Sequence, residues 1–370
     1  MNIKIMRDRI KKNFLGYSIL WIFSLIYFLL IKAREILYSL KIMKQNSLNT
    51  KIICIGNLNT GGTGKTSIVI MLAKKLHEKN KKIAIVTRGY KRKRKTKDTL
   101  IISKENLPEI EKSGDEAMLI FDSLKEYDIP ILINPNRYEA CLKARELFKP
   151  DLILLDDGFQ HISLKRDMNI ILISANQDLH DSILPLGDLR EPFSALKRAD
   201  AVIITHSELA SEEKIEAITN KIKNIKNIEI YRAIYKAKSF YDATKCLNLD
   251  IEKFANKKVF IFSAIGDPDS FEKNLKELDL IIAKNMIFPD HYLFKEKDLY
   301  SISQISQNLP IITTYKDFFK LPQNWKKYLS NRLYIFSIEA EIINSEKKQK
   351  NKKDSPSNHD EIKLIERILK

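Results

Sequence analysis

The sequence predicts an α/β fold with a mostly parallel, doubly wound sheet, a smaller C-terminal α/β domain and an N-terminal membrane-associated helix. Short apolar runs alternate with helical stretches through most of the 370 residues. A glycine-rich loop joins the first of these runs to the next helix, and an uncharged segment precedes both. We therefore expect an N-terminal helix with basic flanks (1–46), a core domain (47–208), a C-terminal domain (209–344) and a polar, charged tail (345–370).

The N-terminal segment from Phe14 to Ile31 contains no charged residue. As a helix it would be roughly 27 Å long, close to the thickness of a bilayer core. Basic residues flank it on both sides, so it could span the membrane or lie in the cytosolic leaflet against anionic headgroups. The alternatives are a buried core helix and a signal peptide, but no A-x-A cleavage pattern follows. We expect contact with an anionic membrane surface.

The glycine-rich loop runs from Asn59 to Thr66, between an apolar run at 51–56 and a helical stretch at 65–79. This is the context of a P-loop, where glycines let backbone N–H groups approach phosphates at a helix N-terminus. Lys65 would reach the β- and γ-phosphates, and the Thr66 hydroxyl would bind Mg²⁺. The core domain is thus predicted to be of the P-loop NTPase type. The candidate ATP-binding residues are Asn59, Thr60, Gly61, Gly62, Thr63, Gly64, Lys65 and Thr66.

One residue departs from the strict P-loop motif, which has glycine at the position of Asn59. Asparagine tolerates left-handed backbone angles better than most residues do. The departure therefore leaves the prediction of a nucleotide site in place.

Further apolar runs extend the βαβ pattern beyond the loop. The predicted strands of the core are 51–56, 82–87, 99–102, 129–133, 151–156, 168–173 and 200–205, with helices around 65–79, 114–127 and 135–148. The predicted strands of the C-terminal domain are 258–263, 279–282, 310–314 and 333–337.

The run at 151–156 ends in Asp156, and Asp157 and a glycine follow. A buried parallel strand delivers its last carboxylate to the sheet edge where open α/β sheets bind ligands. Asp156 is therefore a candidate for holding Mg²⁺ directly or through water. Asp157 would point elsewhere on an extended strand and could serve the acceptor side. The alternative is a simple Asp-Gly turn at the strand end.

A basic stretch without acidic residues extends from Lys81 to Lys97. Arg88 and Tyr90 follow the second predicted strand, at the sheet edge that also carries the glycine-rich loop, where an arginine can bind phosphate bidentately. The KRKRK run at 91–95 is interpreted as a solvated loop facing anionic lipid, with a nucleic-acid patch as the alternative. The formal net charge of +17 favours an anionic partner. Because no zinc-finger or RNA-binding signature accompanies this charge, we expect no nucleic acid partner.

Three further segments have roles that their local pattern leaves open. Asp115 and Glu116 begin a predicted helix, where acids also serve as caps. Alternatively, Asp115 is a base for an attacking hydroxyl and Glu116 a metal-side carboxylate. His291 lies in the C-terminal domain, and a single histidine is commonly structural or exposed. Arg190 lies in a loop, ILPLGDLREP, that could line a site or be an ordinary turn.

Nine motifs occur in order along the chain: GNLNTGGTGKT, VTRGYKRK, SGDEA, NRYEAC, LLDDGFQH, ILPLGDLREP, SAIGDPDSF, FPDHYLF and TTYKD. This series and the apolar N-terminal segment resemble the tetraacyldisaccharide 4'-kinases, the lipid A 4'-kinases of Gram-negative bacteria, over roughly residues 14–337. The resemblance implies Mg²⁺-dependent transfer of the γ-phosphoryl group of ATP to the 4'-hydroxyl of a tetraacylated glucosamine disaccharide 1-phosphate. The product would be the 1,4'-bisphosphate lipid IVA, made at the cytosolic face of the inner membrane.

The resemblance also implies residue roles. Asp115 and His291 form a catalytic pair, with Asp115 as the base and His291 orienting it. The implied metal-side residues are Thr66, Glu116, Asp156 and Asp157, and the implied substrate-binding residues are Arg88, Tyr90, Arg137 and Arg190. This chain departs from the family pattern at Asn59, in the KRKRK run and in the polar tail.

A membrane-positioned regulatory ATPase of the ParA-like kind is the competing interpretation, because its loop also contains GG-x-GKT. That group typically carries a lysine just before the two glycines, where this chain has Thr60. ATP turnover that depends on a glycolipid acceptor would distinguish the kinase from the regulatory ATPase.

Overall fold

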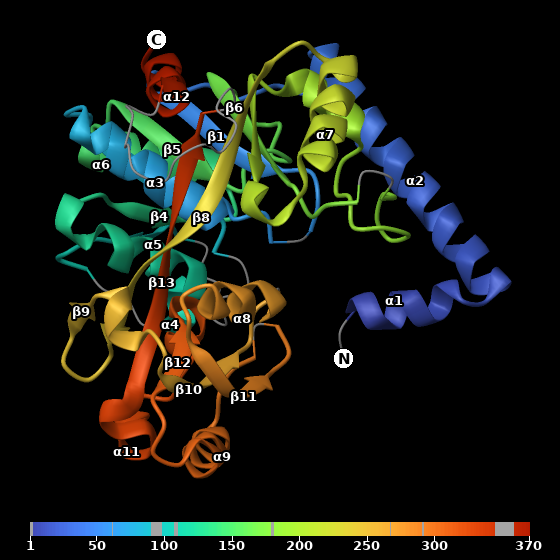
Figure 1. Cartoon of the computed structure of the whole chain (residues 1–370). Helices are drawn as coiled ribbons and strands as arrows, with labels where there is room; N and C mark the ends of the chain where they lie inside the picture. The colour runs from blue at the N-terminus through green and yellow to red at the C-terminus, as the bar shows by residue number, and fades with distance from the viewer. Residues whose placement is uncertain are drawn as a thin grey trace. The chain divides into compact units, whose positions relative to one another are not determined.

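Two long strands, β8 (Glu229–Asp242) and β13 (Leu333–Ile343), carry the chain between the two units of the computed structural model (Figure 1). Unit 1 comprises Met1–Ser113, Ile120–Ile234 and Ala340–Lys370, and unit 2 comprises Gly114–Leu119 and Tyr235–Glu339. The structure describes residues 3–60, 62–89, 98–106, 110–178, 181–266, 268–290, 292–344 and 359–370.

Unit 1 is built on a sheet with the strand order β8-β7-β6-β1-β5-β2-β4-β3. The other strands are β1 (Lys51–Asn57), β2 (Ile83–Thr87), β3 (Leu100–Ile102), β4 (Ile131–Ile133), β5 (Leu152–Asp156), β6 (Met168–Ser174) and β7 (Ala201–Thr205). All described neighbours in this order pair in parallel except β3 and β4. These strands are nearly continuous apolar runs, as expected where both faces of a parallel sheet are buried. The predicted fold class is confirmed.

Helices complete unit 1. They are α3 (Lys65–Glu78), α4 (Ile110–Ser113), α6 (Arg137–Phe148), α7 (Glu212–Ile225) and α12 (His359–Leu369), with the short helices η1 (Lys125–Tyr127), η2 (Phe193–Arg198) and η3 (Ser207–Leu209). Helix α5 (Asp115–Leu124) has its first residues in unit 2 and its remainder in unit 1. Helix α7, which lies beyond the core boundary expected at residue 208, belongs to unit 1 because Ile215, Ile218 and Ile222 join its core.

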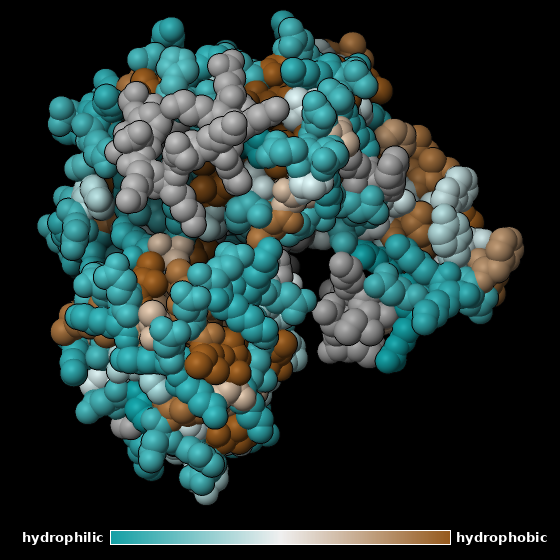
Figure 2. Space-filling view, viewed as in Figure 1, coloured by the Kyte–Doolittle hydropathy of each residue, from teal (hydrophilic) through white to brown (hydrophobic). Residues whose placement is uncertain are grey.

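The N-terminus forms helices α1 (Ile3–Lys11) and α2 (Phe14–Ser39), joined at a sharp turn (Figure 1). Asn13 caps α2, since its side-chain oxygen accepts a hydrogen bond from the backbone N–H of Leu15. Among the described residues, α2 is the one helix long and apolar enough to cross a membrane, by length and composition alone. Figure 2 shows hydrophobic residues gathered along it.

Unit 2 contains a smaller parallel sheet with the order β11-β10-β12-β13. Its strands are β10 (Lys258–Ser263), β11 (Ile281–Ile287) and β12 (Ile311–Thr314), and β9 (Leu247–Leu249) pairs antiparallel with the end of β8. Its helices are α8 (Pro268–Lys276), α9 (Glu296–Ser306), α10 (Tyr315–Phe318), α11 (Lys326–Leu329), η4 (Ile251–Phe254) and η5 (Ser330–Arg332). Buried aromatic rings such as Phe260 and Phe262 fill its core.

The C-terminal segment differs from the expected polar tail. Residues 345–358 lie outside the described residues, but α12 is an amphipathic helix that belongs to unit 1. Leu364, Ile365 and Ile368 are buried, at the helical spacing that places them on one face. The polar composition of the segment before α12 obscured this periodicity.

Candidate functional site

The glycine-rich loop leaves β1 and enters α3, as the sequence predicts. Gly64 has a left-handed φ of 71° directly before Lys65, the first residue of α3, and Thr66 follows. The first turn of α3 therefore directs its backbone N–H groups and the positive end of its dipole to the loop. Gly62 has open space where a Cβ would lie, and Gly61 lies outside the described residues.

A hydrogen-bonded brace closes the beginning of this loop. The Asn57 amide nitrogen donates to the Asn59 side-chain oxygen (2.8 Å) and to the Thr63 hydroxyl (3.0 Å), and all three residues are buried. The backbone N–H of Thr60 donates to the carbonyl of Asp188 (2.8 Å). A glycine could not make the side-chain bond of Asn59, so the departure from the strict motif supplies a contact that the motif lacks.

A charged cluster lies beside the loop, centred on Asp157. Arg190 donates to both Asp157 oxygens, through Nη2 to Oδ1 (2.7 Å) and Nη1 to Oδ2 (3.1 Å), while Lys65 Nζ lies 3.6 Å from Oδ1. Burial on its own would raise the pKa of Asp157, but the Arg190 hydrogen bond and the charges of Lys65 and Arg137 hold that pKa well below its ordinary value. Asp157 is therefore ionised and fixes two cations of the site.

The side-chain direction of Asp157 differs from the one expected. On the assumption of an extended strand, the sequence pointed Asp157 in another direction than Asp156, where it could serve the acceptor side, while the family resemblance placed it beside the metal. Its φ of 52° is left-handed, so the strand alternation stops at Asp156 and the Asp157 carboxylate lies near Lys65. Asp156 is buried at the end of β5 and accepts a hydrogen bond from the Thr87 hydroxyl (3.2 Å).

Three predicted arginines meet around a cavity of about 210 Å³. Its lining consists of Arg88, Pro135, Arg137, Asp157, Gln160, His161 and Arg190. Arg137 is held by the carbonyls of Pro135 (2.8 Å) and Asp157 (3.4 Å). Three guanidinium groups around one small cavity suit a multiply charged anion. Tyr90 and the KRKRK run lie outside the described residues.

Two residues of this cavity, Gln160 and His161, end the motif LLDDGFQH, and the sequence predicted no role for them. Gln160 donates its amide to the Asn57 carbonyl (2.8 Å) and so connects the cavity to β1. Burial and the positive charges of Arg137 and Arg166 lower the pKa of His161 to about 4, so this ring is neutral at pH 7. The sequence signal was their position directly after the Asp-Asp-Gly strand end.

A second charged cluster lies within unit 2. Gly114, with a φ of 87°, precedes Asp115 and Glu116 at the start of α5. Lys316 Nζ donates to Glu116 (3.0 Å), and Lys320 Nζ lies 3.9 Å from Asp115 Oδ2. Burial would lower the pKa of Lys316, but the charges of Glu116 and Asp115 outweigh this and raise it. The two acids at the start of α5 thus form ion pairs with lysines from a distant part of the chain.

The residues that support this cluster were missed by the sequence analysis. The Lys320 side chain is 2% exposed and bonds Asp317 (3.0 Å) and the Ala264 carbonyl (3.1 Å). The motif TTYKD, which contains Lys316 and Asp317, was the available signal. His291, the expected partner of Asp115, lies outside the described residues.

A magnesium ion fits the residues of unit 1. Across the described ranges, no group of three or more His, Cys, Asp and Glu side chains could hold a metal ion. Nucleotide-bound Mg²⁺ needs only one or two protein oxygens, because phosphates and water complete its shell. Thr66, in the first turn of α3, and Asp156, at the end of the neighbouring strand β5, supply oxygen ligands of that kind.

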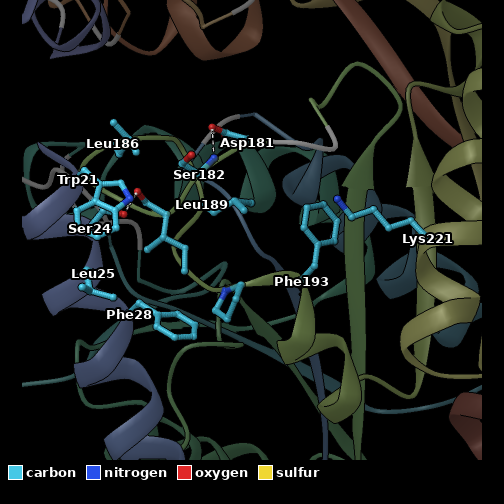
Figure 3. A pocket seen from close by; sticks show the side chains of 12 residues that line it. Trp21, Ser24, Leu25, Phe28, Asp181, Ser182, Leu186, Leu189, Phe193 and Lys221 are labelled. Atoms are coloured by element: carbon cyan, nitrogen blue, oxygen red, sulfur yellow. Dashed lines mark hydrogen bonds between the residues drawn. The ribbon is translucent and has the colours of Figure 1, made fainter. Parts of the chain in front are cut away.

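A larger cavity, of about 490 Å³, lies between α2 and the loop that leads from β6 to η2 (Figure 3). It is lined by Trp21, Ser24, Leu25, Phe28, Asp181, Ser182, Ile183, Leu186, Leu189, Pro192, Phe193 and Lys221. Most of these side chains are apolar, and Lys221 Nζ lies 4.1 Å from the centre of the Phe193 ring. The cavity therefore suits an apolar chain more than a charged ligand.

The family model and the similar proteins that match this chain all point to one family of kinases. Residues 17–354 match the family described as tetraacyldisaccharide-1-P 4'-kinase. The tetraacyldisaccharide 4'-kinase of Elusimicrobium minutum is 36% identical over 345 residues, which cover 92% of each chain. The one from Aquifex aeolicus is 36% identical over 311 residues, 81% of this chain and 88% of its own.

A solved structure resembles almost the whole chain. It is the crystal structure of the "apo" form of LpxK from Aquifex aeolicus in complex with ATP, with a TM-score of 0.73 and 30% sequence identity. The match covers 96% of this chain and 99% of that chain.

Proposed function

This chain belongs to the tetraacyldisaccharide-1-P 4'-kinase family, and we infer that it transfers the γ-phosphoryl group of ATP to the 4'-hydroxyl of a tetraacyldisaccharide 1-phosphate. The product is the 1,4'-bisphosphate, lipid IVA, and the cofactors are ATP and Mg²⁺. The observation that carries this function is the glycine-rich loop with Lys65, Asp157 and Arg190 clustered beside it.

The nucleotide side of the reaction uses residues of unit 1. The loop from Asn59 to Thr66 binds the phosphates through backbone N–H groups, and Lys65 neutralises the β- and γ-phosphates. Thr66 and Asp156 would hold Mg²⁺, with Asp157 as a further metal-side carboxylate. The family resemblance assigns the same role to Glu116, which is a residue of unit 2. When bound, Mg²⁺ neutralises the charge that develops on the transferred group. Asp157 also holds Lys65 and Arg190 in place, as its two contacts indicate.

The acceptor side requires a base for the 4'-hydroxyl proton. We assign this role to Asp115, with His291 as its partner. Lys320 and Lys316 support the assignment, because Lys320 Nζ lies 3.9 Å from Asp115 and Lys316 pairs with its neighbour Glu116, so that cations fix the positions of both carboxylates. A positioned base typically contributes about 10²–10⁴-fold to a rate.

The two cavities of unit 1 match the two chemistries of the acceptor. The cavity lined by Arg88, Arg137 and Arg190 would bind its 1-phosphate, with Tyr90 as a further contact. The apolar cavity beside α2 would take part of an acyl chain. Helix α2 exposes Phe14, Phe23 and many other apolar side chains, which favours its contact with the cytosolic leaflet of the bacterial inner membrane.

The function is tested by transfer of labelled γ-phosphate from ATP to a tetraacylated disaccharide 1-phosphate in detergent micelles. The unmodified chain should label the glycolipid, and both Asp115→Ala and His291→Ala should lose about 10²-fold or more in rate while ATP binding persists. Asp122→Asn, on the same helix as Asp115 and paired with Lys125, is the matched control and should keep the full rate.

Two results would contradict the proposal. Wild-type rates in both Asp115→Ala and His291→Ala would remove the assigned pair. ATP turnover that ignores the glycolipid and rises with a protein partner would favour the regulatory ATPase.

A further inference from the structure

Two consecutive residues, Arg190 and Glu191, contact two different parts of unit 1. Both backbone N–H groups donate to the carbonyl of Leu58 (2.6 and 3.2 Å), directly before the glycine-rich loop. Their side chains then go to different partners. A displacement of this dipeptide would therefore also displace the backbone at the start of the loop.

The Arg190 side chain contacts the nucleotide side. Besides its paired bonds to Asp157, it donates through Nη2 to the Asn57 side-chain oxygen and through Nε to the Asn59 carbonyl (3.0 Å). Asn57 and Asn59 are members of the brace that closes the loop. One guanidinium thus connects the last residue of β1, the loop and the aspartate next to Lys65.

The Glu191 side chain contacts helix α2. It is 0% exposed and pairs with Arg34 of α2 (3.3 Å) and with Arg198 of η2. Arg198 Nε in turn lies 3.4 Å from Glu35 of α2. A buried carboxylate is costly unless cations and hydrogen bonds compensate for its lost hydration, so Glu191 depends on these arginines.

Helix α2 makes further polar contacts with the same loop. The Tyr27 hydroxyl donates to the Arg190 carbonyl (3.2 Å), and the Ser24 hydroxyl donates to the Ile183 carbonyl (2.8 Å). Positions 24, 27, 34 and 35 recur at helical spacing and so share one face of α2. This face combines these polar side chains with the buried Ile31, whereas Ile22 and Phe23 are among the exposed apolar residues of the same helix.

We propose that Arg34, Tyr27 and Glu191 are positioning residues, through which helix α2 holds Arg190 on Asp157 and keeps the nucleotide loop in its binding shape. Helix α2 then has two roles: its apolar residues contact lipid, and its polar face supports the ATP site. The proposal rests on the proposed function only in that Arg190 serves phosphoryl transfer. The support itself concerns nucleotide binding and is measurable without an acceptor.

The test uses the full chain in detergent micelles and separates the two substrates. Affinity for a fluorescent ATP analogue is measured without acceptor, and KM values for ATP and for the glycolipid are measured in the transfer reaction. Arg34→Met should weaken analogue binding roughly tenfold, the effect of about one net hydrogen bond to a charged group. The glycolipid KM should stay within about twofold, because the apolar residues are unchanged.

Companion variants distinguish positioning from loss of structure. Arg34→Lys keeps the charge and should recover most of the affinity, and Tyr27→Phe should weaken it by about threefold through a single hydroxyl. Arg232→Met, which breaks the ion pair of Arg232 with Glu212 (2.7 Å) in the same unit, is the matched control and should leave both substrates unaffected.

The inference is overturned if Arg34→Met changes only the glycolipid KM, or if Arg34→Lys recovers nothing. If Arg34→Met does not fold, Tyr27→Phe decides: unchanged affinity for the analogue overturns the inference. A wild-type chain that binds the analogue and labels no glycolipid would instead refute the proposed function, and the binding comparison would still stand.

Discussion

Helices α2 and α12 both pack on unit 1, but with opposite faces. Helix α12 buries Leu364, Ile365 and Ile368 and carries charged residues elsewhere, the usual arrangement of a surface helix in water. Helix α2 contacts the loop beyond β6 through polar side chains and leaves large apolar side chains exposed. The difference is what the proposed membrane contact requires, with water outside α12 and an apolar phase outside α2.

The two helices are also held by different forces. Burial of apolar surface stabilises α12, with ion pairs at its rim such as Lys75 with Glu361 (3.1 Å). Helix α2 buries Ile31, and beyond that it is held mainly by ion pairs and hydrogen bonds, centred on the fully buried Glu191. Electrostatic contacts of this kind strengthen when the surroundings exclude water, so an apolar phase around α2 would reinforce them.

The largest expected effect comes from the apolar face of α12. Leu364→Ala removes a fully buried side chain and should lower the free energy of unfolding by about 2–5 kcal/mol. Ile362→Ala, at an exposed position of the same helix, should change it by less than about 0.5 kcal/mol. Denaturant unfolding measures both. Equal effects of the two variants would mean that α12 is not docked as described.

A charge introduced on the outer face of α2 should weaken membrane binding rather than stability, the reverse of what is expected for Leu364→Ala. Ile22→Asp, at a position 50% exposed, should weaken binding to vesicles of anionic lipid by roughly 2.5 kcal/mol, the cost of an aspartate within an inserted apolar helix. The free energy of unfolding in detergent should change little. Leu247→Asp, at an exposed apolar position of β9, serves as the control. Unchanged vesicle flotation of Ile22→Asp would show that this face does not contact lipid.

The smallest expected effect on stability concerns Glu229. Its carboxylate forms ion pairs with Lys363 and Arg367 of α12. Partial burial would raise the pKa of Glu229, but hydrogen bonds from Tyr231, Lys363 and Arg367 lower it from 4.5 to about 2. A lowered pKa in the folded state adds stability that is complete above pH about 4.5 and lost as the pH falls towards 2.

Solvent screening limits this contribution to about 1 kcal/mol, because 34% of the Glu229 side chain is exposed. The unmodified chain should therefore lose its stability advantage over Glu229→Gln between these pH values. Parallel unfolding curves of both chains would measure the difference, and an advantage that stays constant across this range would contradict the assignment.

The sheet of unit 1 was predictable because each parallel strand is an uninterrupted apolar run, as in β5 (LILLD) and β7 (AVIIT). Strand β8 was not predicted, since charged residues such as Arg232 and Lys236 interrupt its apolar residues. The packing of α7 on unit 1 also escaped prediction, because local sequence does not specify which domain covers an apolar helix face.

The site was predictable where a local motif defines it and unpredictable where long-range contacts do. The loop and Lys65 follow from the glycine pattern. The direction of the Asp157 side chain depends on one left-handed φ, which composition does not indicate. The pairing of Lys316 with Glu116 joins residues 200 positions apart, beyond the reach of any local pattern. The roles assigned to Asp115 and His291 stay predictions.

The brace between Asn57, Asn59 and Thr63 has a consequence for the thermodynamics of ATP binding. A glycine-rich loop normally loses much conformational freedom when it closes on phosphates. Here, two side-chain hydrogen bonds within the protein itself order part of the loop. The entropy of that ordering is lost when the chain folds, so it no longer opposes the arrival of the nucleotide. Asn59, the one residue that departs from the strict motif, thereby makes the loop pre-organised.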